Sequence, residues 1–222
     1  MHKSDNNNMK TINHKFLKAD FNNPQWQINT LILGTFNPAG SKEYADYYYG
    51  RVKESNKRKS FSNNFWPSLS KYLKKIDNSH IELIPGEYET KEKLMIKFKF
   101  ACIDLIRSVQ TNETMEDYIV GNGYKDEKLF NIEVERIYNT DSIISLIKNK
   151  NIKKVIASWG ALSPAQKSKS VKHEVQNEIN KIKEACPDTI FKIDGKSILP
   201  PFGFSMISHI KLGQLIYQEL VN

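Results

Sequence analysis

The stretch that decides the fold is TLILGTFNPAG, residues 30–40. Its first residues are apolar without a break, which is typical of a strand buried on both faces of a sheet. Gly34 and Gly40 then allow close backbone approach or a positive φ angle, while Pro38 sets the turn and biases Asn37 away from helical geometry. The stretch predicts a buried strand, up to Gly34, that ends in a tight turn presenting Asn37 and several backbone N–H groups.

Apolar runs alternate with helical patterns along the rest of the chain. Two further strands are expected from consecutive apolar residues, at 100–106 and 153–160, and extended segments from 189–203 around the Asp194-Gly195 turn. Helices are expected where apolar residues recur at helical spacing, namely at 65–76, 141–149, 171–185 and 212–220. Strands separated by helices predict a parallel sheet between helical layers, with its ligands at the carboxyl ends of the strands. The GTFNPAG turn lies at such an end.

The composition predicts one soluble domain. A chain of 222 residues is long enough for one sizeable core, so residues 1–222 are interpreted as a single domain with residues 1–20 as a frayed N-terminal extension. The N-terminus has no apolar signal core and no run of about 18 apolar residues occurs, so a cytoplasmic protein without membrane attachment is expected. Cys102 and Cys186 are the two cysteines and stand far apart, which supports neither a disulfide framework nor a metal site.

The positive charge is clustered. The formal net charge is +8 and the sequence pI is about 9.2. Clustered lysine and arginine suit a polyanionic partner, although a lysine-rich surface is equally expected of a chain from an AT-rich genome. One cluster consists of Arg51, Lys53, Lys57, Arg58 and Lys59, and the others occupy 148–154 and 167–172.

The first basic cluster is interleaved with aromatic residues. The segment EYADYYYGRVKESNKRKSFSNNFWPSLSKYL, residues 43–73, contains a run of tyrosines at 47–49 and then Phe61 and Phe65. Aromatic faces stack on bases with roughly 1–3 kcal/mol each, while lysine and arginine hold phosphates. This interleaving favours a nucleic-acid site, and the alternative is that the tyrosines cover the edge of a core.

A series of short segments resembles the uracil-DNA glycosylase superfamily. LILGTFNPAG, DYYYGR and NNFWPSLSKYL are similar to its first motifs, FACIDLIRSVQTNETMEDYI to its second-strand segment, IKKVIASWGAL to its third strand and SILPPFGFS to its last loop. The series spans roughly residues 30–216 in the family's order. Within the superfamily it is most like the hypoxanthine-DNA (deoxyinosine) glycosylase type, and next the mismatch-specific uracil/thymine type.

The resemblance implies a fold and an activity. The fold is a three-layer α/β/α sandwich around a four-stranded parallel sheet. The activity is that of a monofunctional DNA glycosylase, which excises hypoxanthine or uracil from a flipped nucleotide by hydrolysis of the N-glycosidic bond. The expected protein acts on DNA as a monomer and without a cofactor, since the relatives with an iron–sulfur cluster need four cysteines.

The resemblance also assigns roles to single residues. Asn63, the first residue of Asn-x-Phe-Trp, matches the catalytic asparagine of the hypoxanthine type, and Asn37 stands where the mismatch-specific type keeps its water-positioning asparagine. We place Asn63 first and Asn37 second, with Asn64 as a spectator or helix cap. The expected base pocket consists of Gly34, Thr35, Phe36, Pro38, and either Tyr49 or Phe61 as the stacking aromatic. The expected DNA contacts are Arg51, Lys53, Lys57, Arg58, Lys59 and Ser205.

Two departures from the family pattern leave other functions open. The residues VKESNKRKSFS (52–62) are extra and strongly basic, and Pro200-Pro201-Phe202-Gly203 replaces the usual last loop without a histidine before the prolines. His209 is expected to be a helix residue rather than a substitute. One alternative is therefore a glycosylase-fold protein that binds DNA or modified nucleotides without turnover. Another, a different nucleotide-handling enzyme, has no Gly-rich phosphate loop, metal-ligand cluster or Ser-His-acid arrangement to support it.

Overall fold

The computed structural model describes residues 9–16, 23–40, 44–55, 58–61, 63–77, 81–120, 129–157, 169–192 and 208–222. The extended segment expected after residue 192, with the Asp194-Gly195 turn, lies outside these ranges, as do Lys57 and Ser205.

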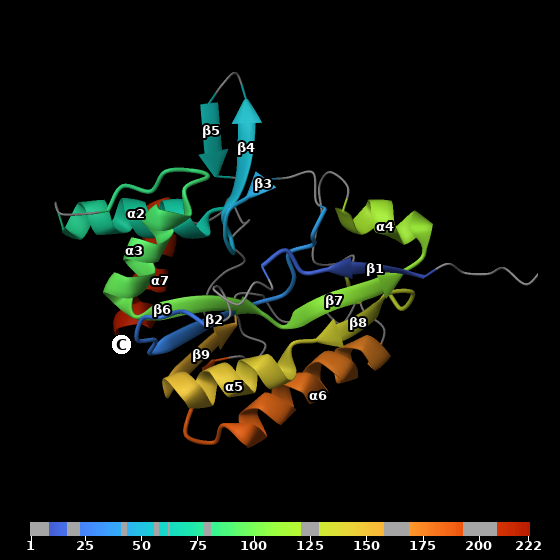
Figure 1. The fold of residues 1–222 in the computed structure, drawn as a ribbon. Helices are drawn as coiled ribbons and strands as arrows, with labels where there is room; N and C mark the ends of the chain where they lie inside the picture. The colour runs from blue at the N-terminus through green and yellow to red at the C-terminus, as the bar shows by residue number, and fades with distance from the viewer. Residues whose placement is uncertain are drawn as a thin grey trace, which may run out of the picture.

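A four-stranded parallel sheet forms the centre of a mixed α/β fold (Figure 1). Its strands, in spatial order, are β10 (Ile190–Lys192), β9 (Lys154–Ala157), β2 (Thr30–Gly34) and β6 (Phe100–Asp104). All three pairings are parallel. The predicted strand at 30–34 and the predicted parallel sheet are confirmed. Because β2 lies between β6 and β9, the chain order reverses at β2, the kind of place where open α/β sheets bind ligands.

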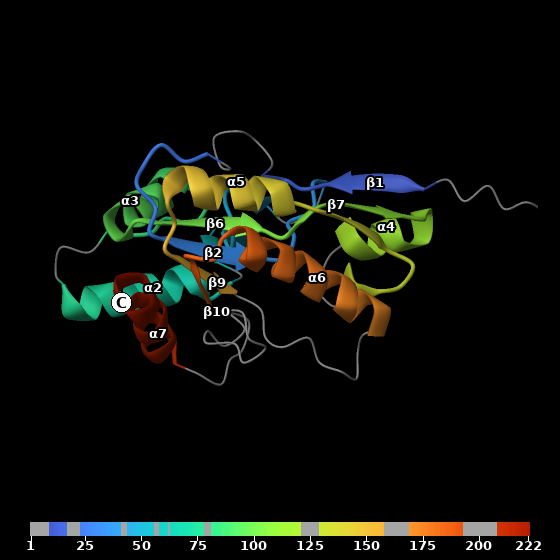
Figure 2. The ribbon, with the colours of Figure 1, turned by 90° about the horizontal axis from the view of Figure 1, so that it is seen from below.

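Helices cover both faces of the parallel sheet, because alternate side chains of each strand point to opposite faces. Leu31 and Leu33 belong to a core shared with α5 (Thr140–Lys150) and α6 (Lys169–Ala185). Ile32 belongs to a second core that is shared with α2 (Phe65–Ile76), α3 (Tyr88–Phe98) and α7 (His209–Val221). Figure 2 shows α5 and α6 along one face, with α2 and α7 side by side.

The sequence predicted most of these helices closely. The helix expected at 65–76 has these bounds in the structure, and the helices expected at 141–149 and 171–185 extend to 140–150 and 169–185. The helix α3 was not predicted from its pattern. Its Lys91 is fully buried, so a charged residue stands on the face that faces the core and interrupts the apolar spacing.

The apolar run at 100–106 is two strands rather than one. β6 ends at Asp104, Leu105 lies between, and β7 (Ile106–Thr111) enters an antiparallel sheet with β1 (Lys10–Asn13) and β8 (Glu135–Tyr138). α4 (Glu113–Val120) follows β7. Asp104 therefore stands at the junction of the two sheets.

The expected frayed N-terminal extension is corrected for its described part. Residues 10–13 pair with β7 along the whole of β1, and the side chains of Ile12, His14 and Phe16 are buried. The segment is polar overall and has one strand-like apolar position, so the sequence carried little signal for an ordered edge strand.

A small antiparallel sheet carries the tyrosine and basic segment. It consists of β3 (Tyr44–Ala45), β4 (Arg51–Ser55) and β5 (Arg58–Phe61). The β4–β5 hairpin stands out from the body of the molecule (Figure 1). No helix of the described residues has the length and apolar character needed to cross a membrane.

The close packing of α2 against α7 can be tested by mutation. A Cβ atom on Gly213 of α7 would collide with the backbone carbonyl of Ser68 on α2, so the two backbones touch. Although alanine is a better helix former than glycine by about 1 kcal/mol, Gly213→Ala is expected to lower the free energy of unfolding by about 2 kcal/mol. Denaturant unfolding measures this change. Gln214→Ala, at the exposed neighbouring position, is the control, and a Gly213→Ala protein as stable as this control would contradict the packing.

Candidate functional site

The turn after β2 is anchored by the segment that follows β1. The backbone N–H of Lys15 donates to the carbonyl of Asn37 at 2.7 Å, and the N–H of Ala39 donates to the carbonyl of Asn13 at 2.7 Å. His14 forms an isolated antiparallel bridge with Pro38. The N-terminal segment therefore forms one wall of the turn that the sequence analysis singled out.

A buried carboxylate stands at the centre of this region. Asp104, the last residue of β6, is level with Gly34, the last residue of β2, because the two are paired in the parallel register. Its Oδ2 atom accepts a hydrogen bond from Nδ2 of Asn37 at 2.6 Å and lies 2.8 Å from Nε2 of His14. The side chain of Asp104 is 2% exposed and that of His14 1% exposed. Three polar side chains from three segments thus meet at the carboxyl edge of the sheet.

The hydrogen bond to Asp104 fixes the orientation of the Asn37 amide. A carboxylate can only accept, so the amide nitrogen of Asn37 must face it and the amide oxygen points away. Asn37 is half-buried, and its oxygen has no hydrogen-bond donor among the described residues. Within the described part of the chain, the amide oxygen of Asn37 thus keeps its capacity to accept a hydrogen bond.

Aromatic rings surround the imidazole of His14. The ring centroids of Phe36 and Tyr48 both lie 5.5 Å from that of His14. Tyr48 is almost completely buried, and its pKa is raised well above its usual value, first by burial and then by the charge of Asp104. Tyr47 is equally buried and bonds with its hydroxyl to the backbone of Cys102 on the edge strand β6. These two tyrosines therefore belong to the core, as the alternative interpretation of the tyrosine run proposed.

Tyr49 differs from its two neighbours. It adopts a left-handed backbone conformation with φ of 57°, which costs a non-glycine residue of the order of 1 kcal/mol and is common at functional sites. Its ring is half-buried and lies 5.1 Å from the ring of Phe65, the first residue of α2. Its hydroxyl approaches Gly34 and the Asp104 carboxylate. The expected stacking residue is thus at the site.

Asn63 supports the start of α2, and Trp66 connects this helix to the tyrosine segment. The side-chain oxygen of Asn63 accepts a hydrogen bond from the backbone N–H of Phe65 at 2.8 Å. The indole N–H of Trp66 donates to the backbone carbonyl of Tyr48 at 2.8 Å. Asn64 is the N-cap residue by position and makes no capping bond with its side chain. Asn63 therefore performs the capping role that the sequence analysis considered for Asn64.

The other expected pocket residues divide into two groups. The side chains of Phe36 and Pro38 are buried, and Thr35 is half-buried with its carbonyl accepting from Ile106, so this turn offers mainly backbone to a ligand. The competing aromatic, Phe61, packs elsewhere: its ring lies 5.1 Å from the ammonium of the buried Lys91. Tyr49 rather than Phe61 is the aromatic that the structure brings to Asp104.

The structure describes the side chains of only some of the basic residues expected to contact DNA. Arg51 begins β4 and is half-buried, and Lys59 on β5 is exposed. For Lys53 and Arg58 only the backbone is described. Lys15, which follows His14, has a pKa lowered by burial first and then by the nearby charge of Arg51, while the carboxylate of Asp46 acts in the opposite direction. Two cations and one carboxylate therefore lie close together in this region.

Sequence reasoning missed His14 and Lys15 and gave Asp104 no role of its own. The sequence does contain a signal that would have singled out Asp104, because a carboxylate ends the otherwise apolar run FACID. His14 and Lys15 had none, because they lie in a polar segment far from the rest of the site in sequence. Their importance depends on the pairing of β1 with β7, which short-range patterns do not reveal.

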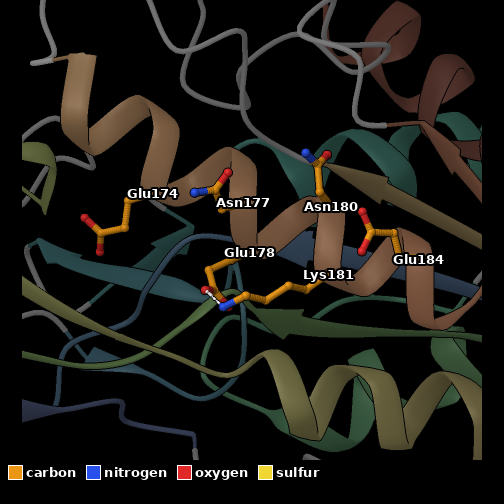
Figure 3. A pocket seen from close by; sticks show the side chains of 6 residues that line it. All are labelled: Glu174, Asn177, Glu178, Asn180, Lys181 and Glu184. Atoms are coloured by element: carbon orange, nitrogen blue, oxygen red, sulfur yellow. Dashed lines mark hydrogen bonds and ion pairs between the residues drawn. The ribbon is translucent and has the colours of Figure 1, made fainter.

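A hollow on the other side of the molecule has the wrong charge for a polyanion. It measures about 350 Å³ and is lined by residues of α6 alone (Figure 3), namely Glu174, Asn177, Glu178, Asn180, Lys181 and Glu184. Two of the glutamates are already used, Glu174 by Arg136 and Glu178 by Thr140 and Lys181. We assign no site to this hollow.

Within the described residues, no group of three or more His, Cys, Asp or Glu side chains is arranged to hold a metal ion. Comparison with models of known families, with curated proteins and with solved structures found no match to this chain.

The close approach of Asp104 and Tyr49 to Gly34 can be tested by mutation. A Cβ atom at this position would collide with Oδ1 of Asp104 and lie 2.7 Å from the hydroxyl of Tyr49. Gly34→Ala is therefore expected to lower the free energy of unfolding by about 1–3 kcal/mol, because the carboxylate and the ring must move. Thermal or denaturant unfolding measures the loss, with Thr35→Ser at the next position as the control. Unchanged stability would show that Asp104 and Tyr49 do not approach Gly34 in this way.

Proposed function

We propose that this chain is a DNA glycosylase-type hydrolase that removes a deaminated base, hypoxanthine or uracil, from a flipped nucleotide. The observation that carries the proposal is the Asn37 amide, held through its nitrogen by buried Asp104 at the carboxyl edge of a parallel sheet. The three-layer α/β/α sandwich of the uracil-DNA glycosylase superfamily fits the helices on both faces of this sheet.

The proposed reaction is hydrolysis, with water as the only co-reactant and no cofactor. The bond between C1′ of the sugar and the base nitrogen breaks, its electron pair leaves with the base, and the oxygen of a water molecule bonds to C1′. The proton that this water loses ends on the departing base, so that the products are the abasic sugar and the neutral base. The transition state carries positive charge on the sugar and negative charge on the base. In such a dissociative reaction, the position of the water contributes more than a strong general base.

Asn37 is the better candidate for holding the water. Its amide oxygen has no donor among the described residues, whereas the oxygen of Asn63 already accepts from the N–H of Phe65. We therefore assign water positioning to Asn37 and the support of α2 to Asn63, which reverses the order that the family resemblance gave. The backbone N–H groups of Phe36 and Asn37 also lack an acceptor among the described residues, so they are free to face the departing base.

Tyr49 and the basic residues supply the binding surface. The half-buried ring of Tyr49 is placed by Phe65 beside Gly34, where a flipped base would stack. Arg51 and Lys15 lie together near the same turn, and the β4–β5 hairpin, with exposed Lys59, extends the basic surface. In this proposal they hold the phosphates of the lesion strand, and the chain acts as a cytoplasmic monomer.

The excision assay tests the proposal. Labelled oligonucleotides with one deoxyinosine, deoxyuridine or deoxyxanthosine, single-stranded and paired, are incubated with the protein, and abasic sites are cleaved with alkali. We expect strand breaks at one lesion or more. Asn37→Ala is expected to reduce the rate about 100-fold with little change in DNA affinity, since only the water is misplaced.

The controls separate chemistry from binding. Asn177→Ala, on the remote face of α6, should excise as fast as the unmodified protein. Asn63→Ala should lose stability more than rate, because it removes a hydrogen bond at the start of α2. Salt-sensitive DNA binding without a break at any lesion would contradict the hydrolase and favour a protein of this fold that binds DNA without turnover.

The salt dependence of DNA binding tests the assigned phosphate contacts. Lys15→Gln and Arg51→Gln should each weaken DNA binding and reduce the slope of log K against log salt by roughly 0.9, the value for one lost phosphate contact. Lys148→Gln and Lys150→Gln are the controls, because the carboxyl end of α5 precedes β9 and lies at the opposite edge of the sheet. Equal effects of both pairs would indicate that DNA is held by net charge alone.

A further inference from the structure

A hydrogen-bond chain connects the N-terminal segment to the proposed reacting amide. The backbone N–H of Phe16 donates to Nδ1 of His14 at 3.0 Å, and Nε2 of His14 lies 2.8 Å from Oδ2 of Asp104. A ring nitrogen that accepts a hydrogen bond carries no proton, so the proton of the imidazole is on Nε2. His14 therefore faces Asp104 as a neutral donor.

The same carboxylate oxygen is the acceptor for the Asn37 amide nitrogen, at 2.6 Å. With His14 and Asp104 almost completely buried, water does not compete for this oxygen. The two donors divide its lone pairs between them, which sets the direction in which the carboxylate points. Without His14, the buried carboxylate of Asp104 would have one hydrogen-bond donor fewer, and it would turn toward a different donor.

We propose that His14 is a positioning residue: acting through Asp104, it fixes the Asn37 amide so that the nitrogen faces the carboxylate and the oxygen points away from it. The catalytic part of this inference rests on the proposed function, whereas the chain of hydrogen bonds does not. His14 itself is remote from the substrate, because Tyr48, Phe36 and Phe16 pack around its ring.

The first test reads the hydrogen bonds directly. Long-range proton–nitrogen NMR spectra of the labelled full chain at neutral pH should show His14 with its proton on Nε2 and an unprotonated Nδ1. The His14→Gln variant assigns these signals by their loss. The side-chain NH2 of Asn37 should show one downfield, slowly exchanging proton that His14→Leu removes and His14→Gln, which keeps an amide donor, retains. A proton on Nδ1, an imidazolium, or an Asn37 signal indifferent to His14→Leu would overturn the inference.

The second test reads the effect on the reaction. In single-turnover excision, His14→Leu is expected to reduce the rate about 10- to 100-fold with unchanged DNA affinity, and His14→Gln to restore most of it. In an Asn37→Ala background, His14→Leu should cause no further loss, because His14 acts only through that amide. Additive losses would show that His14 acts by another route. Unfolding curves check that each variant is folded.

The two tests separate the two proposals. A protein that excises no base while showing the expected NMR signals would refute the proposed function and leave the orientation of Asn37 standing. A protein that excises a base while lacking those signals would refute the role of His14 alone.

Discussion

The candidate site depends on one buried carboxylate, that of Asp104. One of its oxygens is bonded to His14 and Asn37, and its other oxygen lies against Gly34. Burying a charge is unfavourable unless hydrogen bonds replace its hydration, and a stable fold would be obtained more easily with an apolar residue here. The carboxylate is therefore best explained by what it holds in place, which is the amide of Asn37.

The fold brings the partners of Asp104 from three directions. The parallel register places Gly34 and the turn after it beside Asp104. The chain then passes from β6 of the parallel sheet to β7 of the antiparallel sheet, so that Asp104 lies at the junction of the two sheets. The pairing of β1 with β7 then delivers His14. On the other side, α2 holds the tyrosine segment through Trp66, so that Tyr49 reaches the same edge. The pairing of the strands and the position of α2 thus determine which side chains meet at Asp104.

Local patterns predicted the elements that are regular, and they failed where tertiary pairing decides. The strand at 30–34 was predicted from an unbroken apolar run, and the helix at 65–76 from apolar residues that recur at helical spacing. β1 was not predicted, because an edge strand needs little apolar surface. α3 was not predicted either, because the buried Lys91, which is paired with Asp46, interrupts its apolar spacing. At the candidate site, the structure brings Asn37 and Tyr49 to Asp104, but the third residue there, His14, meets Asp104 through a contact between residues 90 positions apart. The roles of the asparagines could not be read from sequence, because each depends on which amide atom is already bonded.

The most direct test of the account is to find where a lesion in DNA touches the chain. Hydrogen–deuterium exchange is measured with and without a duplex that carries a stable abasic-site analogue. The account predicts slower exchange in the turn at 35–40 and in the segment around Tyr49, with no change along α6. Protection of the α6 face, or none at the carboxyl edge of the sheet under conditions where the duplex is bound, would contradict a nucleic-acid site built around Asp104.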